Sequence, residues 1–394
     1  MQIDIVHPNL EVSGTIKYLG GLASGFTALG HQVRLLYTGT RTNYALIESS
    51  LEGVRRERYS GAFSLRLSTA VIGTPLLRLF AAGIFAPDQS VNVVGNSIAG
   101  NRLARLTKET ELIIFSNLLA YPPTWLLRQP TGRDVLIFHE GIGADFLPRG
   151  LRGPVRRYSR AVARRVRLCV AITQPMEERL RSQGVHARVF CNGFFPNVSI
   201  PAQKESIVLV DSRWVWQRDP QRILEIARLV PAARFIMVGR FPDEAVRARL
   251  LEEIRARRLQ NRIEVLGPID EGKLVELYRS ARIALRWAIP GTEDGFPFSL
   301  VLAVSAGCVP VLSAGLGAAH HLAEEVSPEL VGSDDLELGD VVGRLLSDES
   351  YFRTMQSKVL AWRDRRPWRV VASEILRSPA MAGVELRDIP RETG

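Results

Sequence analysis

The sequence predicts an α/β protein of two domains, each a doubly wound parallel β-sheet covered by helices. From residue 206 onward, short runs rich in valine and isoleucine alternate with stretches of helical periodicity, and a looser alternation fills the first half. Most of these runs are continuously apolar, which is typical of parallel strands buried on both faces. The length of 394 residues suits two hydrophobic cores of ordinary size.

The expected strands set the domain boundaries. In the first half we expect strands at residues 3–6, 33–37, 112–116, 135–139 and 168–173. In the second half we expect them at residues 207–211, 234–239, 262–267, 282–287 and 309–313. The stretch between the two sets is rich in proline and polar residues, as linkers are. We therefore predict a first domain over 1–195, a linker over 196–206, a second domain over 207–370 and a tail over 371–394 that crosses back to the first domain.

The composition argues against several classes of protein. A hydrophobic content of 46% and a charged content of 23% are those of a globular chain. No signal peptide is visible, and the most apolar stretch, residues 65–87, is interrupted by Arg66, Pro75 and Arg78 before it reaches the ~20 residues of a membrane span. The three cysteines lie far apart, which argues against a disulfide framework or a zinc site. We expect a cytoplasmic protein.

The net charge of +10 comes almost wholly from arginine. Arginine binds phosphate and carboxylate groups through paired hydrogen bonds, so an anionic ligand or surface is expected. The alternative is that the base composition of the genome enriches arginine codons, without functional meaning for the protein. Nucleic-acid binding is disfavoured because the basic segments lack a recognisable reading module and interleaved aromatic residues.

The strongest signal for a ligand site is the segment 292–317, which follows an expected strand and enters a helix near Pro297. Gly295 allows a ligand to approach the backbone, and the free amides at the helix start, near Phe298 and Ser299, suit a diphosphate. Read from the residues alone, the segment indicates an anion or nucleotide site, or else an ordinary strand-to-helix turn.

This segment resembles the signature of family 4 (group 1) glycosyltransferases, in which an acidic residue, Gly-Phe-Pro, a second acidic residue and Gly-x-Pro-Val recur. The resemblance implies the GT-B fold, two Rossmann-like domains that face a central cleft. In that family the first acidic residue contacts sugar hydroxyls, a position filled here by Asp294 with Glu293 beside it. The second glutamate of the family grips the ribose, and Leu302 stands there instead. The donor-sugar loop would comprise Gly295, Phe296 and Pro297.

Other segments resemble the same family on both sides of this signature. Ser13-Gly14-Thr15 resembles the glycine-rich first loop, which implies that Gly14 and Thr15 face the donor diphosphate. Arg213 and Arg218 resemble the Arg and Lys pair that neutralises the diphosphate, together with the helix start at Phe298 and Ser299. The stretch DVLIFHE resembles the strand that ends in a histidine beside the reacting sugar, so His139 is the catalytic candidate. On spacing alone, His139 would be a structural histidine.

Neither a nucleotide P-loop nor a metal-dependent sugar site is predicted. The segment GPIDEGK at 267–273 fits most of a P-loop, but Leu274 stands where a magnesium-binding hydroxyl is needed. The chain also contains no D-x-D triplet, the pattern by which metal-dependent transferases hold sugar nucleotides. We therefore expect no metal and no cofactor, with a nucleoside-diphosphate sugar as co-substrate.

The region 149–167 predicts an amphipathic basic helix with eight arginines and no acidic residue. Such a helix can lie on anionic lipid, and it resembles the helix by which some family members meet membrane-bound acceptors. The alternative is a helix docked on the first domain with a solvated basic face. The side chains of the expected membrane or acceptor surface are Arg152, Arg156, Arg157, Arg160 and Arg164.

Together these patterns predict a retaining, metal-independent glycosyltransferase of the hexosyltransferase type. Its partners would be a nucleotide-sugar donor and a glycan, glycolipid or small-molecule acceptor, with no nucleic acid. A role in carbohydrate biosynthesis for the cell envelope, at the inner face of the membrane, follows from the basic helix alone. Leu302 motivates the alternative, a GT-B scaffold with impaired catalysis that binds a glycan or a partner protein.

Overall fold

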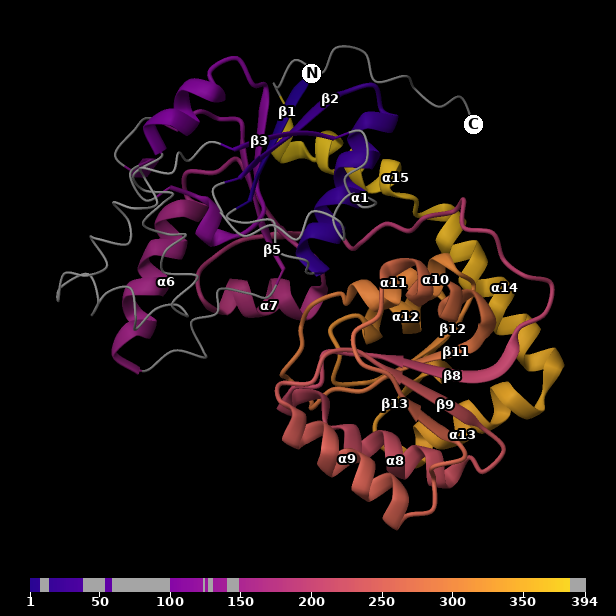
Figure 1. Ribbon diagram of the computed structural model, residues 1–394. Helices are drawn as coiled ribbons and strands as arrows, with labels where there is room; N and C mark the ends of the chain where they lie inside the picture. Colours follow the sequence, from indigo (N-terminus) through magenta and orange to yellow (C-terminus); the bar gives the residue numbers. More distant parts are fainter. Residues whose placement is uncertain are drawn as a thin grey trace. The chain divides into compact units, whose positions relative to one another are not determined.

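The computed structural model describes residues 1–7, 14–37, 54–58, 100–122, 125–126, 130–139 and 149–382 (Figure 1). The chain divides into two compact units, one formed by Met1–Asn192 with Trp368–Gly394 and the other by Gly193–Pro367. The expected linker lies in the second unit, and its last residues already belong to a strand. No helix in the described ranges is long and apolar enough to cross a membrane. The apolar stretch at 65–87 lies outside the described residues.

The first unit is built on a parallel sheet of seven strands within the described residues, in the order β3-β2-β1-β4-β5-β6-β7. The strands are β1 (Gln2–His7), β2 (Gln32–Tyr37), β3 (Arg55–Arg58), β4 (Leu112–Phe115), β5 (Asp134–Phe138), β6 (Leu168–Ala171) and β7 (Arg188–Val189). Its helices include α1 (Gly14–Ala28), α6 (Arg149–Ala163), α7 (Gln174–Ser182) and α15 (Trp368–Arg377), and residues 100–106 are helical as well. The central strands β4 and β5 are buried along their whole length, which explains their continuous apolar sequences.

The C-terminal helix α15 packs beside α1 and belongs to the first unit (Figure 1). The two helices approach closely because Gly25 has no side chain: a Cβ atom there would lie 2.3 Å from the carbonyl oxygen of Trp368. The buried residues of α15 include Trp368, Val371 and Ile375 at helical spacing. The end of the chain that the structure describes is thus part of the core of its first unit.

The second unit holds a parallel six-stranded sheet in the order β10-β9-β8-β11-β12-β13. Its strands are β8 (Glu205–Asp211), β9 (Arg234–Val238), β10 (Ile263–Val265), β11 (Ala281–Arg286), β12 (Val309–Ser313) and β13 (Val331–Gly332). Its helices are α8 (Pro220–Leu229), α9 (Glu244–Ala256), α10 (Glu271–Ser280), α11 (Phe298–Ser305), α12 (Ala319–Glu325), α13 (Asp335–Ser347) and α14 (Glu349–Arg365). Helices α8, α9 and α13 cover one face of the sheet, and α10, α11 and α12 cover the other (Figure 1).

Both units are therefore α/β units on parallel sheets, and the predicted fold class is confirmed. In each sheet the strand order reverses direction at one point: between β1 and β4 in the first unit, and between β8 and β11 in the second. Open parallel sheets bind ligands outside the carboxyl ends of the strands at such a switch point. The residues that end these four strands are thus the first place to look for a site.

Candidate functional site

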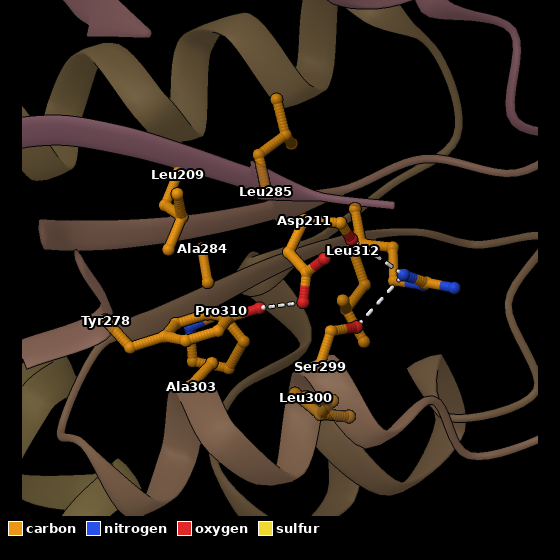
Figure 2. Close-up of a pocket in the computed structure, with 11 residues that line it drawn as sticks. Leu209, Asp211, Tyr278, Ala284, Leu285, Ser299, Leu300, Ala303, Pro310 and Leu312 are labelled. Atoms are coloured by element: carbon orange, nitrogen blue, oxygen red, sulfur yellow. Dashed lines mark hydrogen bonds between the residues drawn. The ribbon is translucent and has the colours of Figure 1, made fainter. Parts of the chain in front are cut away.

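Polar side chains converge on the carboxyl edge of the second sheet. Asp211 ends β8 and Arg286 ends β11, so both lie at the switch point of this sheet. They line a pocket between the strands and α11, which contributes Ser299, Leu300 and Ala303 (Figure 2). The hydroxyl of Tyr278, on α10, donates a hydrogen bond of 3.1 Å to the Asp211 carboxylate. The pocket is therefore lined by apolar side chains together with a few polar ones, among them Asp211, Arg286 and Ser299.

Arg286 is buried, with 7% of its surface exposed, yet it carries a charge. Its Nη1 donates to the backbone oxygen of Asp211 at 3.0 Å and to Ser299 Oγ at 2.9 Å, and its Nη2 donates to Glu293 Oε1 at 2.7 Å. Burial alone would lower the pKa of Arg286, but Glu293 and Asp211 raise it above the ordinary value. The guanidinium thus stays charged in the interior and joins β8, the 287–297 loop and α11.

Glu293 accepts hydrogen bonds from two arginines. Arg218, in the 3-10 helix Trp216–Arg218, donates from Nε and Nη2 at 2.9 and 2.8 Å, a two-pronged contact, and Arg286 donates from the other side. Burial alone would raise the pKa of Glu293, but the charges of Arg286 and Arg218 lower it below its ordinary value. The carboxylate is therefore ionised and held between the two guanidinium groups.

The loop that carries Glu293 is fixed by its backbone. The amide of Gly317 donates to the carbonyl oxygen of Glu293 at 2.8 Å, and Glu293 forms a parallel bridge with Leu316. A Cβ atom at position 317 would lie 1.9 Å from the carbonyl oxygen of Asp294, so only glycine permits this contact. Asp294 is partly exposed beside Glu293, and the loop residues Gly295 and Pro297 are partly exposed as well, whereas Phe296 is buried.

Helix α11 begins at Phe298 with no side-chain cap and no acidic residue in its first turn. The first amides of a helix have no partner within it, and the helix dipole adds partial positive charge there. The start of α11, at Phe298 and Ser299, thus lies at the same edge of the sheet as Arg218 and Arg286. Arg213, two residues after β8, is exposed, and its charge lowers the pKa of Arg218, after the larger effects of burial and of Arg286.

Leu302 is 8% exposed and packs in the core of the second unit with Tyr278, Ala284 and Ala303. Its side chain belongs to the apolar cluster between α10, α11 and the sheet. A carboxylate at this position would be buried in that cluster, so the departure from the family signature is matched by apolar surroundings.

A second polar group lies at the carboxyl edge of the first sheet. Nδ1 of His7, the last residue of β1, is 2.6 Å from the hydroxyl oxygen of Ser116, which follows β4. His139 follows β5, and its ring lies edge-on to Tyr18 with centroids 4.4 Å apart. Burial lowers the pKa of His139 to about 3, and burial followed by the charge of His139 lowers that of His7 to about 3. Both imidazoles are neutral near pH 7.

Gly14 and Thr15 begin α1 in the same unit; Gly14 is exposed and Thr15 partly exposed. The residues before them, 8–13, lie outside the described part of the chain. His7 was not among the sequence-predicted site residues because it ends an apolar run and matches no motif. Its position as the last residue of a strand at a switch point is the signal that identifies it.

The basic helix is α6, and its valines among the described side chains are buried against the first unit. Val155, Ser159 and Val162 are buried, whereas Arg157, Arg160 and Arg164 are exposed and Arg156 is partly exposed. Arg160 Nε donates to the carbonyl oxygen of Gln183 at 2.8 Å, so one of the five arginines also holds the helix to the unit. The side chain of Arg152 lies outside the described residues. Among the described residues no cluster of His, Cys, Asp and Glu has the arrangement of a metal site.

The family model of glycosyl transferases group 1 matches residues 194–358, which cover most of the second unit. No curated protein matches the sequence.

Solved structures that resemble the chain include three proteins of low sequence identity. HepE of Anabaena, in complex with UDP and glucose, has a TM-score of 0.68 at 16% identity over 95% of this chain and 98% of its own. Sucrose-phosphate synthase of Thermosynechococcus elongatus has a TM-score of 0.68 at 19% identity over 95% and 97%. A glycosyltransferase of Rickettsia africae has a TM-score of 0.64 at 14% identity over 96% and 99%. These similarities confirm the GT-B fold.

Proposed function

We propose that this protein is a glycosyltransferase that moves a hexose-type sugar from a nucleoside diphosphate to an acceptor. The observation that carries the proposal is the arginine and glutamate cluster at the switch point of the second sheet. Arg213, Arg218 and Arg286 carry three positive charges, and Glu293 and Asp211 carry two negative charges, which leaves an excess of one positive charge among these five groups beside the start of α11. A diphosphate complements that charge.

The donor sugar would lie over the loop of Asp294, Gly295, Phe296 and Pro297. Asp294 is the acidic residue best suited to accept hydrogen bonds from sugar hydroxyls, because the Glu293 carboxylate is engaged by Arg218 and Arg286. Glu293 then acts by holding Arg218. The UDP and glucose bound to HepE support a donor of this class for the present chain.

His139 would orient the sugar or the acceptor as a neutral group. Its pKa of about 3 supports that role, because a histidine that stays uncharged near pH 7 donates or accepts one hydrogen bond without repelling a cation or attracting an anion. Gly14 and Thr15 would approach the donor diphosphate at the start of α1.

The reaction is proposed to proceed with retention, by attack of the acceptor hydroxyl on the face from which the diphosphate leaves. The bond between the anomeric carbon and the phosphate oxygen breaks, a bond from that carbon to the acceptor oxygen forms, and the acceptor proton passes to the departing diphosphate. Arg213, Arg218 and the helix start near Phe298 stabilise the negative charge that develops on the leaving group. These groups supply the charge compensation, so the mechanism proposed is metal-independent.

The proposed place of action is the cytoplasm, at the inner face of the membrane, with an envelope glycolipid or polysaccharide as acceptor. The exposed arginines of α6 support a contact with anionic lipid. Replacing Arg156, Arg157 and Arg160 together should weaken binding to vesicles that contain an anionic phospholipid. Unchanged vesicle binding would reject the membrane contact and leave the solvated-helix interpretation.

The second candidate function is a GT-B scaffold that binds a glycan or a partner without transferring sugar. The observation in its favour is Leu302, which is packed in the core where the family signature has a ribose-binding glutamate.

A thermal-shift screen against UDP-, GDP-, dTDP- and ADP-linked sugars separates the two functions. A ligand present at a hundred times its dissociation constant stabilises the folded state by about 2.7 kcal/mol, which is readily measured. We expect at least one donor to raise the melting temperature and to be hydrolysed or transferred. No shift with any donor would support the scaffold.

A further inference from the structure

Arg286 matches none of the sequence motifs that suggested the donor site, yet it lies at the centre of that site. It ends β11 at the switch point, is buried, and its Nη atoms donate to a backbone oxygen, a hydroxyl and a carboxylate on three different elements. Its Nε has no hydrogen-bond partner among the described residues. A buried charge is costly unless it is paired, so the groups that pair with Arg286 determine whether it can stay charged.

The partner of Arg286 is a carboxylate that also holds Arg218. Glu293 Oε1 accepts from both arginines, at 2.7 and 2.8 Å, while Oε2 accepts from Arg218 alone. The Arg218 side chain is 20% exposed and that of Arg286 is 9% exposed, so Arg218 is the one that reaches the surface of the site. The two-pronged contact, made by Nε and Nη2, fixes the plane of the Arg218 guanidinium and does not involve its Nη1.

If Glu293 paired with Arg218 alone, the site would bind a diphosphate only weakly. The carboxylate would offset the positive charge of the one arginine, and its own negative charge would repel the phosphate oxygens of an incoming diphosphate. Arg286 changes the charge balance, because its buried guanidinium also pairs with Glu293. Glu293 and Arg286 together are neutral, so Arg218 and Arg213 keep their positive charges for the ligand, while the carboxylate of Asp211 accepts a hydrogen bond from Tyr278.

We propose that Arg286 is a positioning residue for the diphosphate: it neutralises Glu293, so that Glu293 fixes the orientation of Arg218 without cancelling its charge. The inference rests on the proposed donor site and adds to it. It assigns Arg286 no contact with the ligand. Its direct partner at the helix start, Ser299 Oγ at 2.9 Å, is held by the same guanidinium, so Arg286 also fixes the first turn of α11 relative to β8.

The test is a charge-balance series measured by isothermal titration with UDP, and with GDP, dTDP and ADP to find the tightest ligand. Arg286→Lys keeps the charge, Arg286→Met removes it, and the double variant Arg286→Met with Glu293→Gln restores the original net charge. Arg234→Met is the matched control, because Arg234 pairs with Glu264 from the first position of β9, at the opposite edge of the sheet. Circular dichroism and melting temperature confirm that each variant is folded.

We expect Arg286→Met to weaken diphosphate binding roughly 10- to 100-fold, the equivalent of one charge-assisted hydrogen bond. Arg286→Lys should weaken it less. The double variant should bind more tightly than Arg286→Met by about threefold or more, which exceeds the scatter between independent sites. Binding of the corresponding nucleoside, which lacks phosphate, should change little throughout, and Arg234→Met should bind as the wild type.

A merely structural role gives a different pattern, because losing a second buried partner would make the double variant bind no better than Arg286→Met. That result, or equal losses in Arg286→Lys and Arg286→Met, overturns the inference while the donor site stands. Failure of the wild-type chain to bind any of the four diphosphates overturns the donor site and the inference with it.

Discussion

The switch points of the two sheets occupy the same place in the fold but carry opposite kinds of polar group. In the first sheet, His7 ends β1 at the switch point and His139 follows β5, the strand beyond β4, and burial lowers the pKa of each to about 3. At the second switch point, buried Arg286 forms an ion pair with partly buried Glu293, and the pKa of Glu293 lies below its ordinary value. One edge is uncharged near pH 7, and the other is permanently charged.

The difference follows from how each group is compensated. A buried imidazole can lose its proton near pH 7 at little cost, so burial neutralises it. A guanidinium cannot, and it stays buried only where a carboxylate and further acceptors are supplied. The first edge thus suits neutral hydroxyl groups and the second suits an anion, as the proposed function requires.

The largest expected effect comes from placing the missing family carboxylate at Leu302. Leu302→Glu puts a charge into the apolar cluster around Tyr278 and should destabilise the second unit by about 3 kcal/mol or more. Leu302→Met, which conserves volume, should cost less than about 1.5 kcal/mol. Chemical denaturation measures both. A Leu302→Glu variant as stable as the wild type would mean that the position opens to solvent, and would revive a ribose contact there.

The next effect concerns the loop that holds Glu293. Gly317→Ala forces a Cβ atom against the Asp294 carbonyl oxygen and should cost about 2 kcal/mol, with weaker diphosphate binding as the loop shifts. Gly343→Ala is the control, because a Cβ atom in this glycine of α13 meets no atom within 4 Å. There the gain in helix propensity should stabilise the chain by about 0.5–1 kcal/mol. Equal stabilities for the two variants would contradict the close contact at 317.

The smallest effect is a pH dependence of the first unit. The unfolded chain binds a proton at His7 below about pH 6.5, whereas the folded chain does so only near pH 3, so stability is complete above pH 6.5 and falls as the pH falls toward 3. Between pH 7 and 5.5 this histidine should remove about 1 kcal/mol of stability. His7→Asn, which still offers Ser116 a hydrogen bond, should remove this part of the decline in denaturation experiments, while His139, whose pKa is lowered in the same way, keeps its own part. An unchanged slope would show that folding does not lower the pKa of His7.

The sequence predicted the sheets well because their central strands are buried on both faces, as in β4, β5, β8 and β12, and such strands have continuous apolar runs. Arg218 and Ser299 were identified through motifs, and both lie at the carboxyl edge of the second sheet. Arg286 and His7 were missed, because each is a single polar residue at the end of an apolar run. Their partners are far away in sequence: Ser116 lies 109 positions from His7, and Asp211 lies 75 from Arg286.

Such pairings depend on strand order, which periodicity does not reveal. Knowing that β8 neighbours β11 and that β1 neighbours β4 would have directed attention to the last residue of each strand. The role of Glu293 was also beyond the sequence, since its pairing with two arginines appears only when the loop is folded back along Leu316. That the two units face each other across a cleft stays a prediction.

The most direct measurement of the contrast between the two edges is the affinity for the tightest of UDP, GDP, dTDP and ADP in three chains: wild type, Arg218→Met and His7→Asn. If the second edge is the diphosphate site, Arg218→Met loses roughly 10- to 100-fold in affinity and His7→Asn binds as the wild type. Retained affinity in Arg218→Met, or a loss confined to His7→Asn, would contradict the assignment of the anion to the second sheet.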